Sequence, residues 1–512
     1  MSDYTCYMES NIMNTKQRIQ KYRLKFCQIK MISFVIPAIV FIAVGCGSDK
    51  KDPNPGPPKQ PAEIGKAQVW VTTGDQSKLL TKESDISITE ITNASFPTIT
   101  IDDSQKLQEI EGFGAALTGS SAYLINQKMN NSQRTALLQD LFDPVNGIGI
   151  SYLRMTIGAS DFSLSDYTYD DMPFGQTDFD LLNFSISKDQ EDVAPVFKQI
   201  IGISPDIKIM GSPWSPPAWM KTNASLKGGK LKTEAYDVYA RYFVQYIKAY
   251  EAEGITIDAI TPQNEPLYFT ANYPCLDMPA EEQLNFIKNN LGPELEAEAL
   301  TTKIIAYDHN WDNTQYAISI LNDAAANKYV AGSAFHAYAG NVSAMSVVHT
   351  AHPDKGLYFT EISGGEWATN FSDNLQWNMA NIFIGTTKNW SKNVLLWNLA
   401  LDQNYGPKNN GCQDCRGVVT IHSTTGAVTK NVEYYSIGHF SKFVRPGAFR
   451  ISSTPFESST KLDHVAFVNT DGSKVLVASN ADAVPKSFVV KWGDAQFSYF
   501  IKAASVATIV WE

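Results

Sequence analysis

The feature that most constrains the fold of this 512-residue chain is a repeated alternation of strand-like and helix-like segments. The strand-like segments are short and rich in apolar residues, and several are separated by segments such as 236–253, where apolar residues recur at helical spacing. The eight strand-like segments are 109–116, 150–157, 207–212, 255–261, 303–307, 330–336, 356–361 and 393–399. Eight such β/α units are typical of a (β/α)8 TIM barrel, so we predict an α/β fold with a barrel over residues 105–431.

The pattern changes after residue 431. Short alternating runs such as 474–479 and 487–492 are punctuated by Asp471-Gly472 and Gly493-Asp494, which are turn signals, so antiparallel β-structure is expected here. Two further strand-like runs, 68–73 and 99–101, precede the barrel. We therefore predict that residues 64–104 and 432–512 together form an attached antiparallel β-sandwich domain.

The first 63 residues carry signals for export. Six basic residues between positions 16 and 30 precede an apolar run from Met31 to Gly45. This run is too short to span a bilayer comfortably, and a basic flank followed by a short apolar segment is typical of a secretory signal. The run ends in Ala43-Val44-Gly45-Cys46, which resembles a bacterial lipobox, so Cys46 is the predicted lipidation site; a plain signal peptide and an uncleaved anchor are the alternatives.

Residues 1–46 are then a leader, and residues 47–63, with many prolines and no core-forming pattern, form an extended tether. On this interpretation the protein is exported and lipid-anchored to the outer membrane, at the cell surface or on the periplasmic face.

The charge of the chain excludes one class of partner. The formal net charge is −11, and no basic cluster follows the first fifty residues, so no nucleic acid partner is expected. Aromatic residues make up 12% of the chain; most are expected in the core, but an enzyme that stacks sugar rings also uses them. We expect a monomer.

Three of the six cysteines belong to the leader, which leaves Cys275, Cys412 and Cys415. The Cys412-Gln-Asp-Cys415 stretch could be half of a zinc site, a redox pair or a local disulfide. Further zinc ligands are not evident, which favours a disulfide or two loop thiols.

Two glutamates stand where strand-like segments end. Glu265 lies between Pro262 and Pro266, which end a strand and restrict the residues between them, and Glu361 closes segment 356–361. Glu265 alone could equally be an ion-pair partner. Two carboxylates at the mouths of parallel strands are what a two-carboxylate glycosidase requires, one to protonate the leaving oxygen and the other to attack or to activate water. We expect them roughly 5 Å apart, with the pKa of Glu265 raised by the charge of Glu361.

Other residues at strand ends can serve the same site. Arg154 lies on the second strand and could hold a nucleophilic carboxylate ionised, with a structural ion pair as the alternative. The remaining candidates for substrate binding are Trp214, Trp311, His336, Tyr338 and Trp397. For any one aromatic residue core packing is the simpler interpretation, but several at one barrel face indicate sugar binding. The stretch Asp308 to Asp312 is read as a polar loop and not as metal ligands, because consecutive residues seldom converge on one ion.

Several ordered stretches together resemble glycoside hydrolase family 30, the family of lysosomal glucocerebrosidase and of β-1,6-glucanases. They include Glu111 to Thr118, Leu153 to Ser163, Ser212 to Asn223, Asn264-Glu265-Pro266, His336-Ala337-Tyr338, Thr360-Glu361, Trp397 to Leu401 and Gly438 to Phe443. The resemblance runs from about residue 108 to the C-terminus, and it implies a catalytic barrel with a β-sandwich built from both ends of the chain.

The resemblance also implies roles for individual residues. It implies Glu265 as acid/base, Glu361 as nucleophile and Asn264 as donor to the sugar 2-hydroxyl. Trp214 and Trp397 fall on positions that line the glycone pocket, and Arg154, His336 and Tyr338 on positions around the nucleophile.

The sequence thus predicts a retaining β-glycosidase whose substrate is a β-glucan, with β-1,6-linked glucan as the leading choice. A glucosylceramidase or small β-glucoside hydrolase is the alternative within the enzyme class, and a catalytically inactive glycan-binding lipoprotein is the alternative outside it. No metal and no organic cofactor is expected, because glycosyl transfer between two carboxylates requires only proton movement and charge stabilisation.

Overall fold

The computed structural model describes residues 62–91 and 96–512. The predicted leader, the lipidation site Cys46 and almost all of the tether lie outside the described residues. The described residues belong to one compact unit. Within the described ranges, no helix combines the length and the apolar character needed to cross a membrane.

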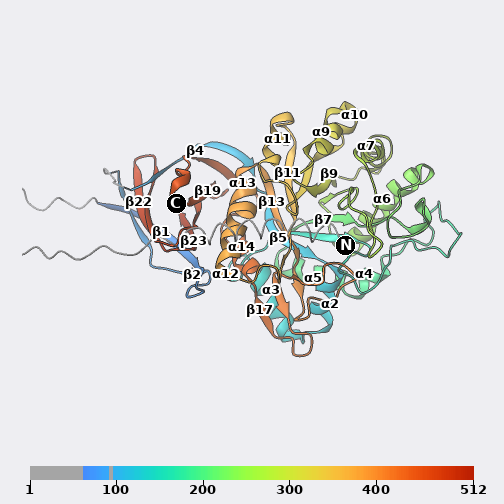
Figure 1. Ribbon diagram of the computed structural model, residues 1–512, viewed down its shortest axis with the longest axis horizontal. Coiled ribbons are helices and arrows are strands. Elements are labelled where there is room, and N and C mark those ends of the chain that lie inside the picture. The colour runs from blue at the N-terminus through green and yellow to red at the C-terminus, as the bar shows by residue number, and fades with distance from the viewer. Residues whose placement is uncertain (1–61, 92–95) are drawn as a thin grey trace, which may run out of the picture. The chain divides into compact units, whose positions relative to one another are not determined.

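Eight parallel strands close into a barrel, as the sequence predicts (Figure 1). In chain order they are β5 (Gly112–Leu117), β6 (Tyr152–Ile157), β7 (Lys208–Pro213), β8 (Ala259–Ile260), β9 (Lys303–Asn310), β10 (Val330–His336), β11 (Gly356–Glu361) and β13 (Ser391–Asn398). The pairing of β13 with β5 completes the closure.

Strand β8 is shorter than the predicted segment 255–261. It has two residues, although Asp258 and Thr261 on either side still donate backbone hydrogen bonds to β7. Pro262 has no N–H to continue the ladder, and the chain turns so that the N–H of Asn264 reaches the carbonyl of Pro213. The short strand therefore releases the residues of the site from the sheet.

Helices cover the outside of the barrel (Figure 1). They are α2 (Gly119–Gln127), α3 (Asn131–Phe142), α4 (Ser187–Glu191), α5 (Val193–Ile203), α6 (Tyr236–Ala252), α7 (Ala280–Phe286), α8 (Gly292–Ala297), α9 (Thr314–Asn322), α10 (Ala324–Asn327), α11 (Ala344–Ala351), α12 (Phe371–Trp377) and α13 (Ile384–Lys388). The predicted helix 236–253 is α6, which buries Tyr239, Tyr242 and Tyr246 along one side.

The inside of the barrel is filled. Seven strands each contribute one buried side chain to a separate cluster, namely Tyr152, Met210, Ala259, Ile305, Ala334, Tyr358 and Leu395. Because this apolar layer fills the interior, the barrel is a packed core and not a pore, and polar chemistry is confined to its ends.

The sandwich uses strands from both ends of the chain, as predicted. Its ten strands run in the order β2-β1-β23-β20-β19-β18-β4-β21-β22-β3, and β1 also pairs with β3. They are β1 (Glu63–Thr73), β2 (Thr81–Lys82), β3 (Ile86–Glu90), β4 (Thr98–Glu109), β18 (Phe449–Ser453), β19 (Leu462–Val468), β20 (Lys474–Asn480), β21 (Lys486–Trp492), β22 (Ala495–Ile501) and β23 (Ser505–Trp511). The predicted boundary at 104/105 falls inside β4.

The prediction that β-structure begins at residue 432 is wrong. Residues Val432–Ser441 form helix α14, and the strands begin at Phe449. Helix α14 contacts β5 of the barrel and β23 of the sandwich, so nearly all its side chains are buried and its sequence lacks a one-sided apolar pattern. His439 joins the two parts, because its ring nitrogens contact the hydroxyls of Thr508 and Thr72, each at 2.8 Å.

Two facing glycines give a test of barrel packing. A Cβ atom at Gly332 on β10 would lie 2.0 Å from the carbonyl oxygen of Gly356, a backbone atom that cannot move aside. We expect Gly332→Ala to lower the free energy of unfolding by about 1–3 kcal/mol or more, measured by urea denaturation. The control is Gly202→Ala in α5, where a Cβ meets nothing within 4 Å; it should stabilise the protein by about 0.5–1 kcal/mol. Equal effects of the two substitutions would contradict the close approach of β10 and β11.

Candidate active site

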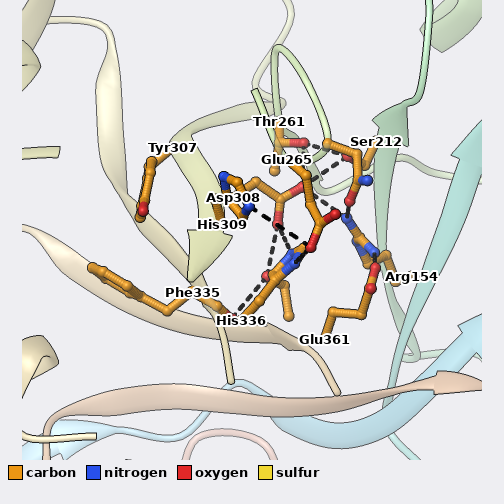
Figure 2. A network of polar contacts seen from close by, with 12 residues as sticks. Arg154, Ser212, Thr261, Glu265, Tyr307, Asp308, His309, Phe335, His336 and Glu361 are labelled. Atoms are coloured by element: carbon orange, nitrogen blue, oxygen red, sulfur yellow. Dashed lines mark hydrogen bonds and ion pairs between the residues drawn. The ribbon is translucent and has the colours of Figure 1, made fainter. Parts of the chain in front are cut away.

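Polar side chains converge at the carboxyl ends of the barrel strands (Figure 2). Arg154 comes from β6, Asp308 from β9, His336 from β10 and Glu361 from β11, while Glu265 follows β8. Carboxylate oxygens of Glu265 and Glu361 lie within 4.8 Å of each other. This agrees with the predicted separation and with the short spacing of glycosidases in which one carboxylate attacks directly.

Three irregularities in the barrel ladder coincide with residues of the site. At three positions a residue has no partner on the neighbouring strand, although the residues on either side of it are paired. These residues are Asp308 in the β9–β10 pair, Thr360 in the β10–β11 pair and Trp397 in the β13–β5 pair. An extra residue in one strand of a pair re-aims its side chain and is common beside active sites. The skipped Thr360 and Asp308 meet, since the Thr360 hydroxyl donates to Asp308 Oδ1 at 2.7 Å.

Asp308 is the centre of the network, and the prediction that it belongs to a polar loop is wrong. Its side chain is fully buried at the end of β9. Its carboxylate accepts from Arg154 Nη2 (2.8 Å), Ser212 Oγ (2.8 Å), Thr261 Oγ1 (2.8 Å), Thr360 Oγ1 (2.7 Å) and His336 Nε2 (3.0 Å). Burial raises the pKa of Asp308, but the charge of Arg154 and the hydrogen bond from His336 outweigh it and hold the pKa well below its usual range. Asp308 is therefore a fixed negative charge.

Arg154 joins Asp308 to the catalytic candidates. Its Nη1 contacts Glu361 Oε2, and its Nη2 donates to Asn264 Oδ1 at 2.7 Å. Glu361 Oε1 accepts from the Tyr338 hydroxyl at 2.9 Å, so both oxygens of Glu361 have donors. The predicted pairing of Arg154 with Glu361 is confirmed.

The amide of Asn264 is oriented by the same guanidinium. Because Arg154 can only donate, the atom of Asn264 that faces it is the carbonyl oxygen, and Nδ2 is left to donate elsewhere. This arrangement suits the predicted contact with a sugar hydroxyl, which stays a prediction.

Glu265 is held in an uncommon backbone conformation. Its φ of 46° lies in the left-handed region, and its N–H donates to the carbonyl of Asp308 at 3.0 Å. Its Oε1 lies 3.0 Å from His336 Nδ1 and 4.0 Å from His309 Nε2. The fold thus holds Glu265 against His336.

His336 bridges two carboxylates. Nδ1 faces Glu265 and Nε2 faces Asp308, each at 3.0 Å, an arrangement that an imidazolium satisfies by donating from both ring nitrogens. Burial lowers the pKa of His336, but the charge of Glu361 and the bonds to Asp308 and Glu265 raise it to about 9.

The pKa values of the two glutamates differ from the prediction, which placed a raised pKa on Glu265. Burial raises the pKa of Glu265, but the hydrogen bond and charge of His336 outweigh it, so the pKa is lowered. The pKa of Glu361 is raised by burial and by the charges of Glu265 and Asp308, against the lowering effect of His336 and Arg154. The prediction considered only the two glutamates and omitted the imidazolium between Glu265 and Asp308.

Trp214 and Trp397 stack on each other, with ring centroids 5.0 Å apart and an interplanar angle of 21°. The Arg154 guanidinium lies over both rings, at 5.1 and 5.4 Å from their centroids. Both indoles belong to a small buried cluster at the mouth of the barrel. Trp311 instead lies in the main core against Phe359, at 5.6 Å between centroids, which is the core-packing interpretation that the sequence also allowed.

A disulfide borders this cluster. Cys412 and Cys415 are bonded, one of the alternatives left open by the sequence, and both contribute to the Trp214–Trp397 cluster. Short strand β15 (Cys415–Arg416) pairs with β12 (Gly364–Gly365), which begins three residues after Glu361. Strands β14 (Ala400–Leu401), β16 (Val419–Ile421) and β17 (Val428–Lys430) form a separate small sheet.

One further acid was missed by sequence reasoning. Asp161 follows β6, and burial together with the charges of Glu361 and Glu265 raises its pKa well above the usual range. Its Oδ1 is buried without a hydrogen-bond partner among the described residues. An uncharged carboxyl can both donate to and accept from a hydroxyl group. The signal in the sequence was its position after a barrel strand, in the stretch Gly158 to Ser163.

Three side chains of the site are of types that can bind a metal ion. Within residues 62–91 and 96–512, Glu265, His336 and Glu361 form the one group whose ligand atoms lie close enough together. Both nitrogens of His336 are already occupied as donors, and Arg154 adds a second positive charge beside the carboxylates. These residues do not fit a cation. Independence from metals stays a prediction.

Comparison with known proteins gives matches over both the barrel and the sandwich. The family model described as "Glycosyl hydrolase family 30 TIM-barrel domain" matches residues 110–444. The model described as "Glycosyl hydrolase family 30 beta sandwich domain" matches residues 447–509. An endo-1,6-beta-D-glucanase of Neurospora crassa is 39% identical over 75% of this chain and 81% of its own length. The lysosomal acid glucosylceramidase of Mus musculus is 30% identical over 81% of this chain and 83% of its own length. The solved structure of the endo-beta1,6-glucanase BT3312 is 38% identical, with a TM-score of 0.82 over 88% of this chain and 99% of that one.

The His336 imidazolium predicts a pH-dependent stability. Its pKa is raised above the usual value, so its stabilising contribution should be fully present below about pH 6.5 and lost as the pH rises towards about 9. The free energy of unfolding of the wild type, relative to His336→Gln, should fall by up to about 3 kcal/mol between pH 6 and pH 9.5. Urea denaturation at several pH values measures this.

His422→Gln is the matched control, because His422 is exposed. Its difference from the wild type should stay within about 0.5 kcal/mol over the same pH range. A difference between the wild type and His336→Gln that does not change with pH would show that His336 is not a buried imidazolium.

Proposed function

The chain belongs to glycosyl hydrolase family 30, and from this membership and its site geometry we propose that it is a retaining β-glycosidase that cleaves β-1,6-glucan. The observation that carries the reaction type is the separation of at most 4.8 Å between oxygens of Glu265 and Glu361. The choice of substrate is supported by three relatives named endo-1,6-beta-D-glucanases, which are 35–39% identical, whereas the relatives named glucosylceramidases are 30–31% identical.

In the first step an oxygen of Glu361 attacks the anomeric carbon, and the bond from that carbon to the leaving oxygen breaks. Glu265 transfers a proton to the leaving oxygen, which departs as a hydroxyl. Arg154 and Tyr338 orient Glu361 through its two oxygens and keep the attacking carboxylate in place. The product of this step is a glycosyl ester on Glu361.

In the second step Glu265, now a carboxylate, takes a proton from water while the water oxygen attacks the anomeric carbon. The ester bond to Glu361 breaks and the carboxylate returns to its contacts with Arg154 and Tyr338. Two inversions at one carbon give retention of configuration.

The proton that Glu265 transfers to the leaving oxygen comes from His336. In the free protein His336 is an imidazolium and Glu265 a carboxylate, 3.0 Å apart. A proton moved from Nδ1 to Oε1 gives neutral His336 and a protonated Glu265, with no change in the number of protons at the site. The pair is therefore the acid, and Asp308 on Nε2 orients the ring.

We also propose that the chain is exported and attached to the outer membrane through lipidation at Cys46. The support is the basic flank, the apolar run from Met31 to Gly45 and the lipobox-like Ala43-Val44-Gly45-Cys46. An enzyme tethered in this way encounters polysaccharide more readily than intracellular lipid, which agrees with the proposed substrate.

The substrate is tested by product profiles on pustulan, laminarin, xylan and glucosylceramide. We expect β-1,6-linked oligosaccharides from pustulan, with the anomeric configuration of the substrate in the first product formed, and rates at least about tenfold lower on the other three. Proton NMR during early turnover measures linkage and anomer together. Preference for glucosylceramide would favour the alternative substrate, binding of glucan without turnover would favour a glycan-binding protein, and an inverted product would exclude the mechanism.

Substitution of each glutamate in turn distinguishes their roles in the reaction. Glu361→Gln removes the nucleophile, so every substrate should lose turnover by a similar factor, on the order of 10⁴ or more. Glu265→Gln removes only proton transfer, so an aryl β-glycoside with a good leaving group should still glycosylate the enzyme and then stall. Azide should release the stalled intermediate as a β-glycosyl azide. If azide instead releases a β-glycosyl azide from Glu361→Gln, and Glu265→Gln gives no β-glycosyl azide, the two roles are reversed.

A further inference from the structure

Exposed apolar side chains follow the acid/base candidate directly. Leu267, Tyr268 and Phe269 are 38%, 44% and 58% exposed. Three consecutive exposed apolar residues in a surface loop are unfavourable unless they bind a ligand or a partner. The mechanism above uses none of them.

Tyr268 is tied to the site on two sides. Its backbone N–H donates to the carbonyl of Glu265 at 2.9 Å. Its ring stacks on Tyr273, with centroids 6.4 Å apart and an interplanar angle of 24°. Tyr273 in turn packs against the cluster that contains Trp214 and Trp397. A row of aromatic rings therefore runs from the buried indoles of the site to the exposed ring of Tyr268.

The loop that carries Tyr268 is anchored at its far end. Buried Cys275 accepts the N–H groups of Thr270 and Gly228 on its sulfur, each at 3.1 Å. Nζ of Lys221 donates to the carbonyl of Cys275 at 2.6 Å, which ties this loop to the one that follows β7. The ring of Tyr268 is thus held before substrate arrives, and little conformational entropy is lost when a ligand stacks on it.

We propose that Tyr268 is the stacking platform for the leaving-group sugar, the glucosyl residue whose oxygen receives the proton from Glu265. This inference rests on the proposed function. The leaving oxygen must lie within about 3 Å of the Glu265 carboxyl, so the sugar that bears it lies on the Glu265 side of the site, where Tyr268 is exposed. A pyranose ring presents a face of C–H bonds, which packs well on an aromatic ring.

The linkage gives a reason for such a platform. A β-1,6 bond includes the rotatable C5–C6 bond of the leaving sugar, so the linkage by itself leaves that sugar free to turn. Stacking on a fixed ring restricts the rotation and aligns the leaving oxygen with Glu265. Tyr268 is therefore a specificity residue for β-1,6-linked chains and does not take part in bond breaking.

The test compares two substrates that differ only in the leaving group. In a β-1,6-linked gluco-oligosaccharide the leaving group is a sugar, which can stack on the platform. In the corresponding β-glycosyl fluoride the leaving group is a fluoride ion, which cannot. We expect Tyr268→Ala to lower kcat/KM on the oligosaccharide about tenfold and to leave kcat/KM on the fluoride unchanged. Tyr268→Phe should stay within about threefold of the wild type on both, because it keeps the ring.

Phe500→Ala is the matched control, since Phe500 is also a highly exposed aromatic residue, on β22 of the sandwich. It should leave both substrates unaffected. If Tyr268→Ala keeps the wild-type kcat/KM on the oligosaccharide, or loses kcat/KM equally on the fluoride, Tyr268 is not the platform. The proposed function would be unaffected by either result. A wild-type enzyme that cleaves the fluoride but not the β-1,6-linked oligosaccharide would overturn the proposed substrate and the platform together.

Discussion

The ion network around Asp308 is the interaction on which the rest of the site depends. Three carboxylates, those of buried Asp308 and Glu361 and of partly buried Glu265, share two cations, Arg154 and His336. The negative charges exceed the positive ones by one, and the hydroxyl groups that donate to Asp308 help to offset the excess. Removing one member of such a network leaves an unpaired charge in a medium of low polarity, which typically costs several kcal/mol. The network is therefore formed as a whole, and its geometry sets the distance between the two glutamates.

The barrel holds this network by departing from regular pairing. A regular ladder would alternate the side chains of each strand between the interior and the helices. The register skips at Asp308, Thr360 and Trp397 give each of these strands one additional residue at its carboxyl end. The apolar layer below, with Tyr152 and Tyr358, fills the interior of the barrel beneath the site. Irregular backbone at the mouth is thus supported by close packing beneath it.

Much of the fold followed from local patterns. The strand segments were recognisable because buried parallel strands are continuous apolar runs, and Glu265 and Glu361 were recognisable because each terminates such a run. Helix α14 was missed because it is buried on nearly all sides between barrel and sandwich, so its sequence has no polar face. Asp308 was missed because strand β9 extends three residues beyond its apolar part, and nothing in the local sequence marks that extension.

The sequence by itself determined the barrel, the sandwich built from both chain ends and the pair of glutamates, because apolar periodicity and strand termination are local properties of the chain. It did not determine the ionisation of that pair. The pKa of Glu265 depends on His336, which is held as an imidazolium by Asp308; Asp308 and His336 lie on two strands, and Glu265 lies in the loop after a third. Electrostatic effects depend on distance in space and on burial, and only the tertiary structure decides both.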